Sequence, residues 1–214
     1  MSTLSNSIVH GNCVNVMSGM PARSVDFILT DPPYVSRYKD REGRTIPNPG
    51  NFAWLKPAFT EMFRILRRDS FCVCFYGWAH IDKFATAFRE AGFRPVGHLA
   101  FPKRYTSGTR FLRYQHEAAY LLAKGNPKQP AHPIGDVLDW TDYTGNRLHP
   151  SQKPTSMLLP LIDTFSPRDG LVLDPFAGSG STLVAAKMLG RSWLGIELDA
   201  NYHDAARRRL KSAN

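Results

Sequence analysis

Short apolar runs alternate along the chain with longer stretches in which apolar residues recur every three or four positions. The short runs predict buried strands at 8–12, 25–30, 70–76, 93–101, 116–123, 171–174 and 192–197. The periodic stretches predict a brief helix or turn that closes at Pro21, an Ala-rich helix that ends near Leu189, and helices at 52–67, 80–91, 155–165 and 201–212. This alternation is typical of an α/β fold with a mostly parallel sheet and helices on both faces.

Three stretches interrupt this rhythm. Residues 35–51 are rich in Pro and Gly and directly follow a strand end, so we expect an active-site lid loop there, with cations that contact DNA: Arg37, Lys39, Arg41 and Arg44. Residues 102–115 predict a small basic hairpin in which aromatic rings are interleaved with Lys103, Arg104, Arg110 and Arg113. We expect this hairpin and the loop at 124–148 to contact DNA. A solvated, Arg-rich turn would have the same composition.

The charge of the chain narrows the class of partner. Lys and Arg number 27 against 18 Asp and Glu, and the resulting net charge of +9 favours a polyanionic partner. A basic surface that binds no polyanion would carry the same charge. Near the end of the last predicted helix we expect a solvated cluster that suits the helix dipole: Arg207, Arg208, Arg209 and Lys211.

The cysteine, histidine and apolar residues argue against a disulfide framework, a metal site and membrane association. The three cysteines, an odd number, argue against a disulfide framework and for a reducing, cytoplasmic location. The seven histidines are scattered singly, so we expect no metal site. No segment approaches the ~18 apolar residues of a membrane span, so no membrane association is expected.

The predicted strand at 25–30 ends in the sequence Asp31-Pro32-Pro33-Tyr34. Neither proline has a backbone N–H, so the strand stops there and leaves a carboxylate and an aromatic ring on a stiff turn. In open α/β sheets, ligands bind at this end of the strands. Tyr34 offers a stacking face for a flat base, while Asp31 and the Pro32 carbonyl offer acceptors for an exocyclic amine. A proline-terminated strand with an N-cap Asp is the purely structural alternative.

A second strand end, at Asp174, leads into a Gly-x-Gly turn, Pro175-Phe-Ala-Gly-Ser-Gly-Ser-Thr182. Such a turn lets the backbone approach a ligand closely. A phosphate-binding P-loop would need a lysine after Gly180, and a dinucleotide fingerprint would need a third glycine where Leu183 stands. The remaining candidate is S-adenosylmethionine (SAM), whose ribose hydroxyls Glu197, at the end of the next strand, could hold. The alternative is that Glu197 is an ordinary acidic residue at a strand end, with no role in binding a ligand.

Three motifs together resemble the SAM-dependent amino DNA methyltransferases: Asp174–Thr182, Asp31–Tyr34 and His149-Pro-Ser-Gln-Lys-Pro154. Because the base motif precedes the cofactor motif, the chain resembles the β-group of that family, in which the motif order is circularly permuted. The resemblance covers nearly the whole chain and implies a single Rossmann-like methyltransferase domain over residues 1–214. It also implies a seven-stranded, mostly parallel sheet of order 3-2-1-4-5-7-6, with strand 7 antiparallel.

The resemblance assigns roles to residues at matching positions. It implies that Asp31 and the Pro32 carbonyl bind the target amine, and that Tyr34, after Pro33, stacks on a base extruded from the duplex. Ser151 and Lys153 would approach the methionine end of SAM, Asn12 its adenine and Glu197 its ribose. The remaining cofactor-binding residues would be Asp174, Phe176, Ala177, Gly178, Gly180, Ser181 and Thr182. Methyl transfer would be direct, without a covalent enzyme intermediate.

The resemblance also bears on the substrate, which is expected to be double-stranded DNA. Asp at position 31 favours the N6 amine of adenine, because Ser is commoner there in cytosine-N4 enzymes. A cytosine-N4 enzyme and a catalytically inactive SAM- and DNA-binding module are the alternatives. Only about 25 residues lie between the hairpin and His149. We therefore expect short or weak sequence specificity, or recognition shared between the subunits of a homodimer.

Overall fold

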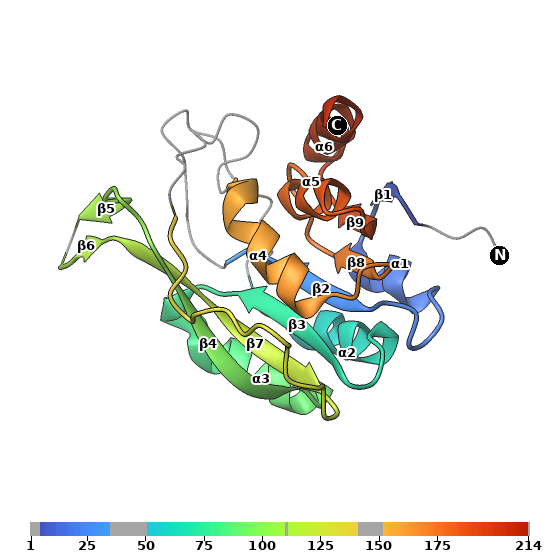
Figure 1. Ribbon diagram of the computed structural model, residues 1–214, viewed down its shortest axis with the longest axis horizontal. Helices are drawn as coiled ribbons and strands as arrows, with labels where there is room; N and C mark the ends of the chain where they lie inside the picture. The colour runs from blue at the N-terminus through green and yellow to red at the C-terminus, as the bar shows by residue number, and fades with distance from the viewer. Residues whose placement is uncertain (1–4, 35–50, 110, 141–151, 214) are drawn as a thin grey trace.

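The computed structural model describes residues 5–34, 51–109, 111–140 and 152–213. Within them, seven strands form one sheet (Figure 1). In order across the sheet they are β1 (Ser7–His10), β9 (Ser192–Glu197), β8 (Leu171–Asp174), β2 (Phe27–Thr30), β3 (Ser70–Phe75), β7 (His116–Lys124) and β4 (Arg94–Pro102).

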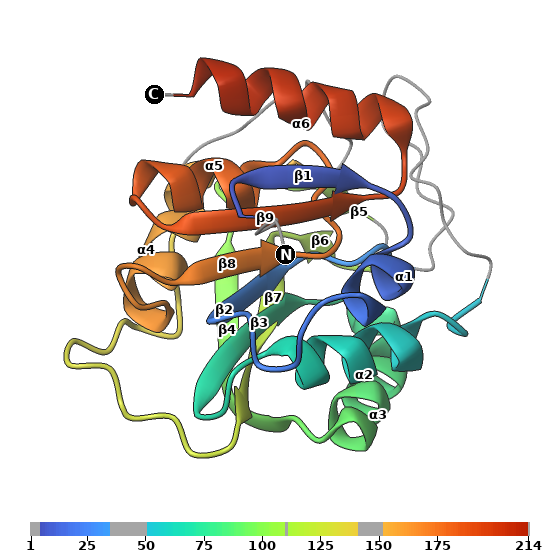
Figure 2. The ribbon, with the colours of Figure 1, turned by 90° about the vertical axis from the view of Figure 1, so that its right-hand side faces the viewer.

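The order and directions of these strands confirm the predicted sheet. The strands from β1 to β3 pair in parallel, and β7 runs antiparallel to both of its neighbours. This is the order 3-2-1-4-5-7-6 with its antiparallel strand 7. The first strand, β1, pairs in parallel with the last one, β9, at one edge of the sheet (Figure 2).

Helices cover both faces of the sheet, as predicted. One face packs against α1 (Cys13–Ser18), α2 (Leu55–Ile65) and α3 (Ile81–Ala91), and the other against α4 (Thr155–Phe165) and α5 (Ser181–Met188). The last helix, α6 (Ala200–Ser212), packs on β1 and α5 (Figure 2). Three short elements complete the described chain: η1 (Trp78–His80), β5 (Gly108–Thr109) and β6 (Arg113–Tyr114).

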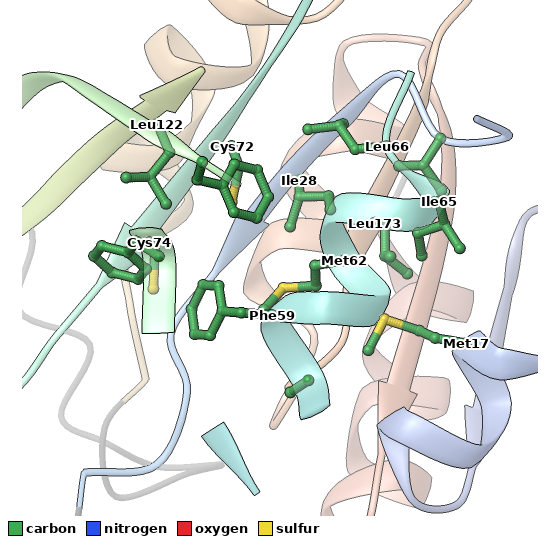
Figure 3. Packing of buried hydrophobic residues seen from close by; sticks show 14 of the residues in the cluster. Met17, Ile28, Phe59, Met62, Ile65, Leu66, Cys72, Cys74, Leu122 and Leu173 are labelled. Atoms are coloured by element: carbon green, nitrogen blue, oxygen red, sulfur yellow. The ribbon is translucent and has the colours of Figure 1, made fainter. Parts of the chain in front are cut away.

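Alternation along β2 and β3 divides the core between the two faces. Ile28 and Cys72 point to the face covered by α2, where Phe59 and Met62 pack against them (Figure 3). Phe27 and Val73 point to the opposite face, against α4. Both faces of these strands are therefore buried, and this explains why the strands appear in the sequence as continuous apolar runs.

Two predicted elements differ in detail from the observed ones. The helix expected at 52–67 begins at Leu55 and ends at Ile65, because Leu66 is already extended and Arg67 donates its backbone N–H to Val25. The loop expected at 124–148 is described as far as Trp140. Part of it runs beside β4 through isolated bridges at Val137 and Trp140, and the Trp140 side chain is buried.

Two of the cysteines lie on a buried strand, as the sequence predicts. Cys72 and Cys74 are buried thiols on β3, and burial raises the pKa of both. None of the helices in the described ranges combines the length and apolar character that a bilayer crossing requires. The same residues contain no cluster of three or more potential metal ligands.

Candidate active site

The two motif turns lie side by side because β2 and β8 are parallel neighbours, with Ile28 opposite Leu173. The last residue of β2, Thr30, donates a hydrogen bond of 2.9 Å from its hydroxyl to the Asp174 carboxylate at the end of β8. Two turns that are 144 positions apart in the sequence are thus joined by a buried hydrogen bond. A cavity between them is lined by residues of both, including Asp31, Asp174, Phe176 and Ser181.

Asp174 organises the glycine turn. Its Oδ1 also accepts a hydrogen bond of 3.1 Å from the Phe176 amide, so one oxygen holds both the turn and its neighbour Thr30. Burial raises the pKa of Asp174 to about 7, although hydrogen bonds from Thr182, Phe176 and Thr30 act in the opposite direction. Gly180, with φ 79°, then starts α5 in a left-handed conformation that few residues other than glycine tolerate.

Glu197, at the end of β9, is held against the same turn. Its Oε2 accepts a hydrogen bond of 2.7 Å from the Gly178 amide, and its Oε1 accepts one of 2.8 Å from the Asp199 amide. Burial raises the pKa of this carboxyl, and these amides oppose the shift. Each carboxylate oxygen retains a further lone pair, so Glu197 can still accept hydrogen bonds from a pair of hydroxyls.

Arg209 corrects the expectation of a solvated cluster at the end of the last helix. Its guanidinium Nη1 donates to the Ser179 carbonyl at 3.2 Å and to the Ser181 hydroxyl at 2.8 Å, so it braces the glycine turn from α6. Arg207 and Arg208 are exposed, as expected. The expectation failed for Arg209 because a helix dipole argument concerns only one helix and leaves out what packs beside it.

On the base turn (Asp31–Tyr34), both carboxylate oxygens of Asp31 accept hydrogen bonds. The Tyr34 hydroxyl donates to Asp31 Oδ1 at 2.6 Å, and the Lys153 ammonium donates to Asp31 Oδ2 at 2.5 Å. Burial raises the pKa of Asp31, while the positive charge of Lys153 acts to lower it. Lys153, which was expected near the methionine end of SAM, lines the cavity and pairs with the Asp31 carboxylate.

A chain of alternating charges continues from this pair. Lys153 lies 2.9 Å from Glu117 of β7, and Glu117 lies 2.5 Å from the ammonium of Lys103. Burial alone would raise the pKa of Glu117, but the two ammonium groups outweigh it and lower that pKa. Burial alone would lower the pKa of Lys153, but Asp31 and Glu117 outweigh it and raise that pKa. Two buried cations thus neutralise two carboxylates, which offsets part of the cost of burying them.

The contacts of Lys103 correct the prediction that this cation of the basic hairpin contacts DNA. The Lys103 side chain is only 6% exposed, and its ammonium lies over the Trp140 ring, so it points inward rather than toward a DNA phosphate. Arg104 and Arg113 are exposed on the hairpin, as a DNA-contacting role requires. The lid loop, except for Asn51, and the side chains of Arg37, Lys39, Arg41, Arg44, Arg110 and Ser151 lie outside the described residues.

Asn12 lies next to Glu197 at the edge of the site. Its neighbour Gly11 donates a backbone hydrogen bond of 2.9 Å to the Glu197 carbonyl. The Asn12 carboxamide oxygen caps α1 by accepting from the Val14 amide at 2.9 Å. This cap occupies the oxygen and leaves the amide nitrogen as the group that Asn12 can offer to a ligand.

The residues present fit SAM. The buried carboxylate of Asp174 lines the cavity, and an acid suits a ligand that carries a sulfonium and an ammonium group. Glu197, Gly178 and the start of α5 provide acceptors and backbone for the ribose and the amino-acid part. The fold together with this pair of turns defines the class, a SAM-dependent methyltransferase.

Comparisons with known proteins identify the family. A family model described as DNA methylase matches residues 25–208, and the chain therefore belongs to the DNA methylases that modify exocyclic amines with SAM. YubD of Escherichia coli (strain K12), a methylase by name, is 52% identical over 202 residues, covering 94% of this chain and 88% of YubD. The type II methyltransferase M.HinfI of Haemophilus influenzae is 26% identical over 249 residues, covering 96% of this chain and 68% of M.HinfI.

Solved structures share the fold. The M1.HpyAVI–SAM complex superposes with a TM-score of 0.75 at 22% identity, covering 95% of this chain and 98% of that one. The PvuII DNA methyltransferase, described as cytosine-N4-specific, superposes with a TM-score of 0.77 at 18% identity, covering 95% and 85%. At such identities the likeness concerns the fold.

Sequence reasoning missed Glu117 and Arg209 as parts of the site. The predictions give Glu117 no role and place Arg209 in solvent. No local signal identifies Glu117, because its contact with Lys103 depends on the register between β4 and β7, in which Phe101 lies opposite Glu117 and Lys103 lies two residues further along the same face. For Arg209 no local pattern distinguishes it from its two arginine neighbours.

Asp174 is expected to make stability depend on pH. Its pKa is about 7 in the folded protein, and an unfolded Asp titrates near about 3.9. The folded state therefore binds the extra proton, so the stabilisation is full below about pH 4 and is lost as the pH rises through about 7. We expect the free energy of unfolding in urea, without SAM, to decline less between about pH 5 and 8 in Asp174→Asn than in the wild type.

The exposed Asp204 provides the control, because Asp204→Asn should keep the wild-type dependence on pH. Parallel curves for the wild type and Asp174→Asn would contradict the assignment.

Arg209 is expected to control SAM affinity through the turn that it braces. Arg209→Met removes both hydrogen bonds to Ser179 and Ser181 but keeps an apolar stem. We expect the dissociation constant for SAM, measured by calorimetry, to rise by at least about tenfold, since a hydrogen bond to a charged group contributes about 1.5–3 kcal/mol and about 1.4 kcal/mol corresponds to a factor of ten. Arg208→Met, on the exposed neighbour, is the matched control. Equal affinities for the two variants would show that the brace has no effect on binding.

Proposed function

We propose that this protein transfers a methyl group from SAM to the N6 amine of adenine in double-stranded DNA. The observation that carries the proposal is the position of Asp31, on a turn hydrogen-bonded to the neighbouring glycine turn, with the Tyr34 ring beside it. An acid at this position, in a chain of this family, favours adenine. The net charge of +9 and the exposed Arg104 and Arg113 suit a DNA partner.

The base turn prepares the amine for attack. SAM, when bound, supplies an electrophilic methyl group on its sulfonium. Asp31 and the Pro32 carbonyl accept the two N–H hydrogens, which favours the pyramidal form in which the nitrogen lone pair is available. Asp31 can accept one of these hydrogens although Tyr34 and Lys153 already contact it, because each carboxylate oxygen has two lone pairs. Lys153 holds the carboxylate in place and favours its ionised form.

Tyr34 is positioned to bind the base by stacking. Its ring lies edge-on to Phe84, with centroids 6.5 Å apart, and its hydroxyl is tied to Asp31. A base must leave the duplex to reach this turn, because an amine paired inside duplex DNA cannot approach a sulfonium at the end of β8. The short or weak sequence specificity and the homodimer are still predictions.

Cytosine-N4 methylation remains the second candidate, because the two amines are chemically alike and the fold is shared with the PvuII enzyme. An inactive SAM- and DNA-binding module is disfavoured, since Asp31, Tyr34 and Glu197 are all present and in contact with their turns.

The test is mass spectrometry of nucleosides from DNA that lacks both modifications and has been incubated with protein and SAM. We expect N6-methyladenine without N4-methylcytosine. Asp31→Ala should reduce the product by at least about a hundredfold, the scale of removing one preorganised polar contact, and leave SAM affinity nearly unchanged. Asp169→Ala, in the exposed turn that precedes β8, is the control with full activity.

Each alternative has its own result. N4-methylcytosine without N6-methyladenine would establish the cytosine enzyme, and SAM binding without any modified base would establish the inactive module. If Asp31→Ala abolished both methylation and SAM binding, the role assigned to Asp31 would be wrong.

A further inference from the structure

Trp78 is a large aromatic residue that the site does not use. It starts η1, directly after the carboxyl end of β3, and is 70% exposed. Its ring stacks on Tyr114 of β6, with centroids 6.2 Å apart and planes at 20°. The β5–β6 hairpin that carries Tyr114 projects beyond the ends of β4 and β7 (Figure 1). Two elements distant in sequence thus form one aromatic pair, in which Trp78 is exposed and Tyr114 is half-buried.

The pair adjoins the base turn. The residue before Trp78 is Gly77, and a Cβ placed there would lie 3.1 Å from Cγ of the Tyr34 ring. The backbone at Gly77 therefore touches the ring that is proposed to stack on the target base. Trp78 is one residue further along, so the aromatic pair begins at the rim of the site.

The charges around the pair favour DNA over a second copy of this chain. Arg104 and Arg113 are exposed on the same hairpin, and no acidic residue lies between Phe101 and His116. Two copies meeting through this surface would bring like charges together. DNA meets it with phosphates for the arginines and with flat bases for the rings, a combination typical of surfaces that bind unstacked bases.

We propose that the Trp78–Tyr114 pair stacks on bases of double-stranded DNA next to the target, compensating for the stacking that they lose when the target nucleotide leaves the duplex. This inference rests on the proposed function. The contribution is specific to duplex DNA, because extrusion from a helix is the step that exposes those neighbouring bases.

The experiment compares transfer of a labelled methyl group from SAM to native DNA and to the same DNA after heat denaturation. Trp78→Ala should lower the rate on native DNA by about tenfold, since stacking contributes about 1–3 kcal/mol per base. On denatured DNA the loss should be smaller than about threefold, because no duplex is opened there. Trp78→Phe should recover most of the rate on native DNA.

The matched control is Met188→Ala. Met188 is another exposed apolar residue, 53% exposed, but it lies at the far end of α5. This variant should behave as the wild type on both DNA forms. Thermal unfolding and SAM affinity should be the same for all the variants.

A second readout does not depend on methyl transfer. Adding native DNA should quench the fluorescence of Trp78, seen as the difference between the wild type and Trp78→Phe. If the wild type showed this quenching but transferred no methyl group, the proposed function would fail and the stacking surface would stand.

Three results would overturn the inference. Trp78→Ala could match Met188→Ala on native DNA, or it could lose as much activity on denatured DNA as on native DNA. It could also convert a dimer into a monomer in sedimentation, which would make this surface an interface between copies.

Discussion

The site depends on the parallel pairing of β2 with β8. A parallel pair brings two carboxyl ends to the same edge of a sheet, and here those ends carry the base turn and the glycine turn. The hydrogen bond from Thr30 to Asp174 fixes the two turns relative to each other. If β2 and β8 were not neighbours, neither turn would hold two reactants in contact, whatever residues it contained.

The second constraint is electrostatic. Asp31 is a half-buried carboxylate, and burial by itself disfavours its charged form by raising its pKa. Lys153 opposes this effect and is itself held by Glu117, which in turn binds Lys103 of the hairpin segment. The environment of the Asp31 carboxylate therefore depends on Lys153 from a loop, Glu117 of β7 and Lys103 directly after β4.

Much of this arrangement was predictable because it depends on local sequence. Continuous apolar runs located the strands, and the prolines after Asp31 located the base turn, since each effect acts within a few residues. The family resemblance then supplied the strand order. The inward direction of Lys103 and the brace from Arg209 were not predicted, because each depends on which element packs beside it. A basic residue in a hairpin does not by itself reveal the Glu117 on the facing strand.

A crystal structure with bound SAM would test the central claim most directly, namely that the two adjacent turns hold a methyl donor facing a base. The account predicts the adenosine beside Glu197, the amino-acid part against the glycine turn, and the sulfonium methyl group directed toward Asp31 and Tyr34. A methyl group directed away from Asp31 and Tyr34 would contradict the account, even if every other contact of the donor were as expected.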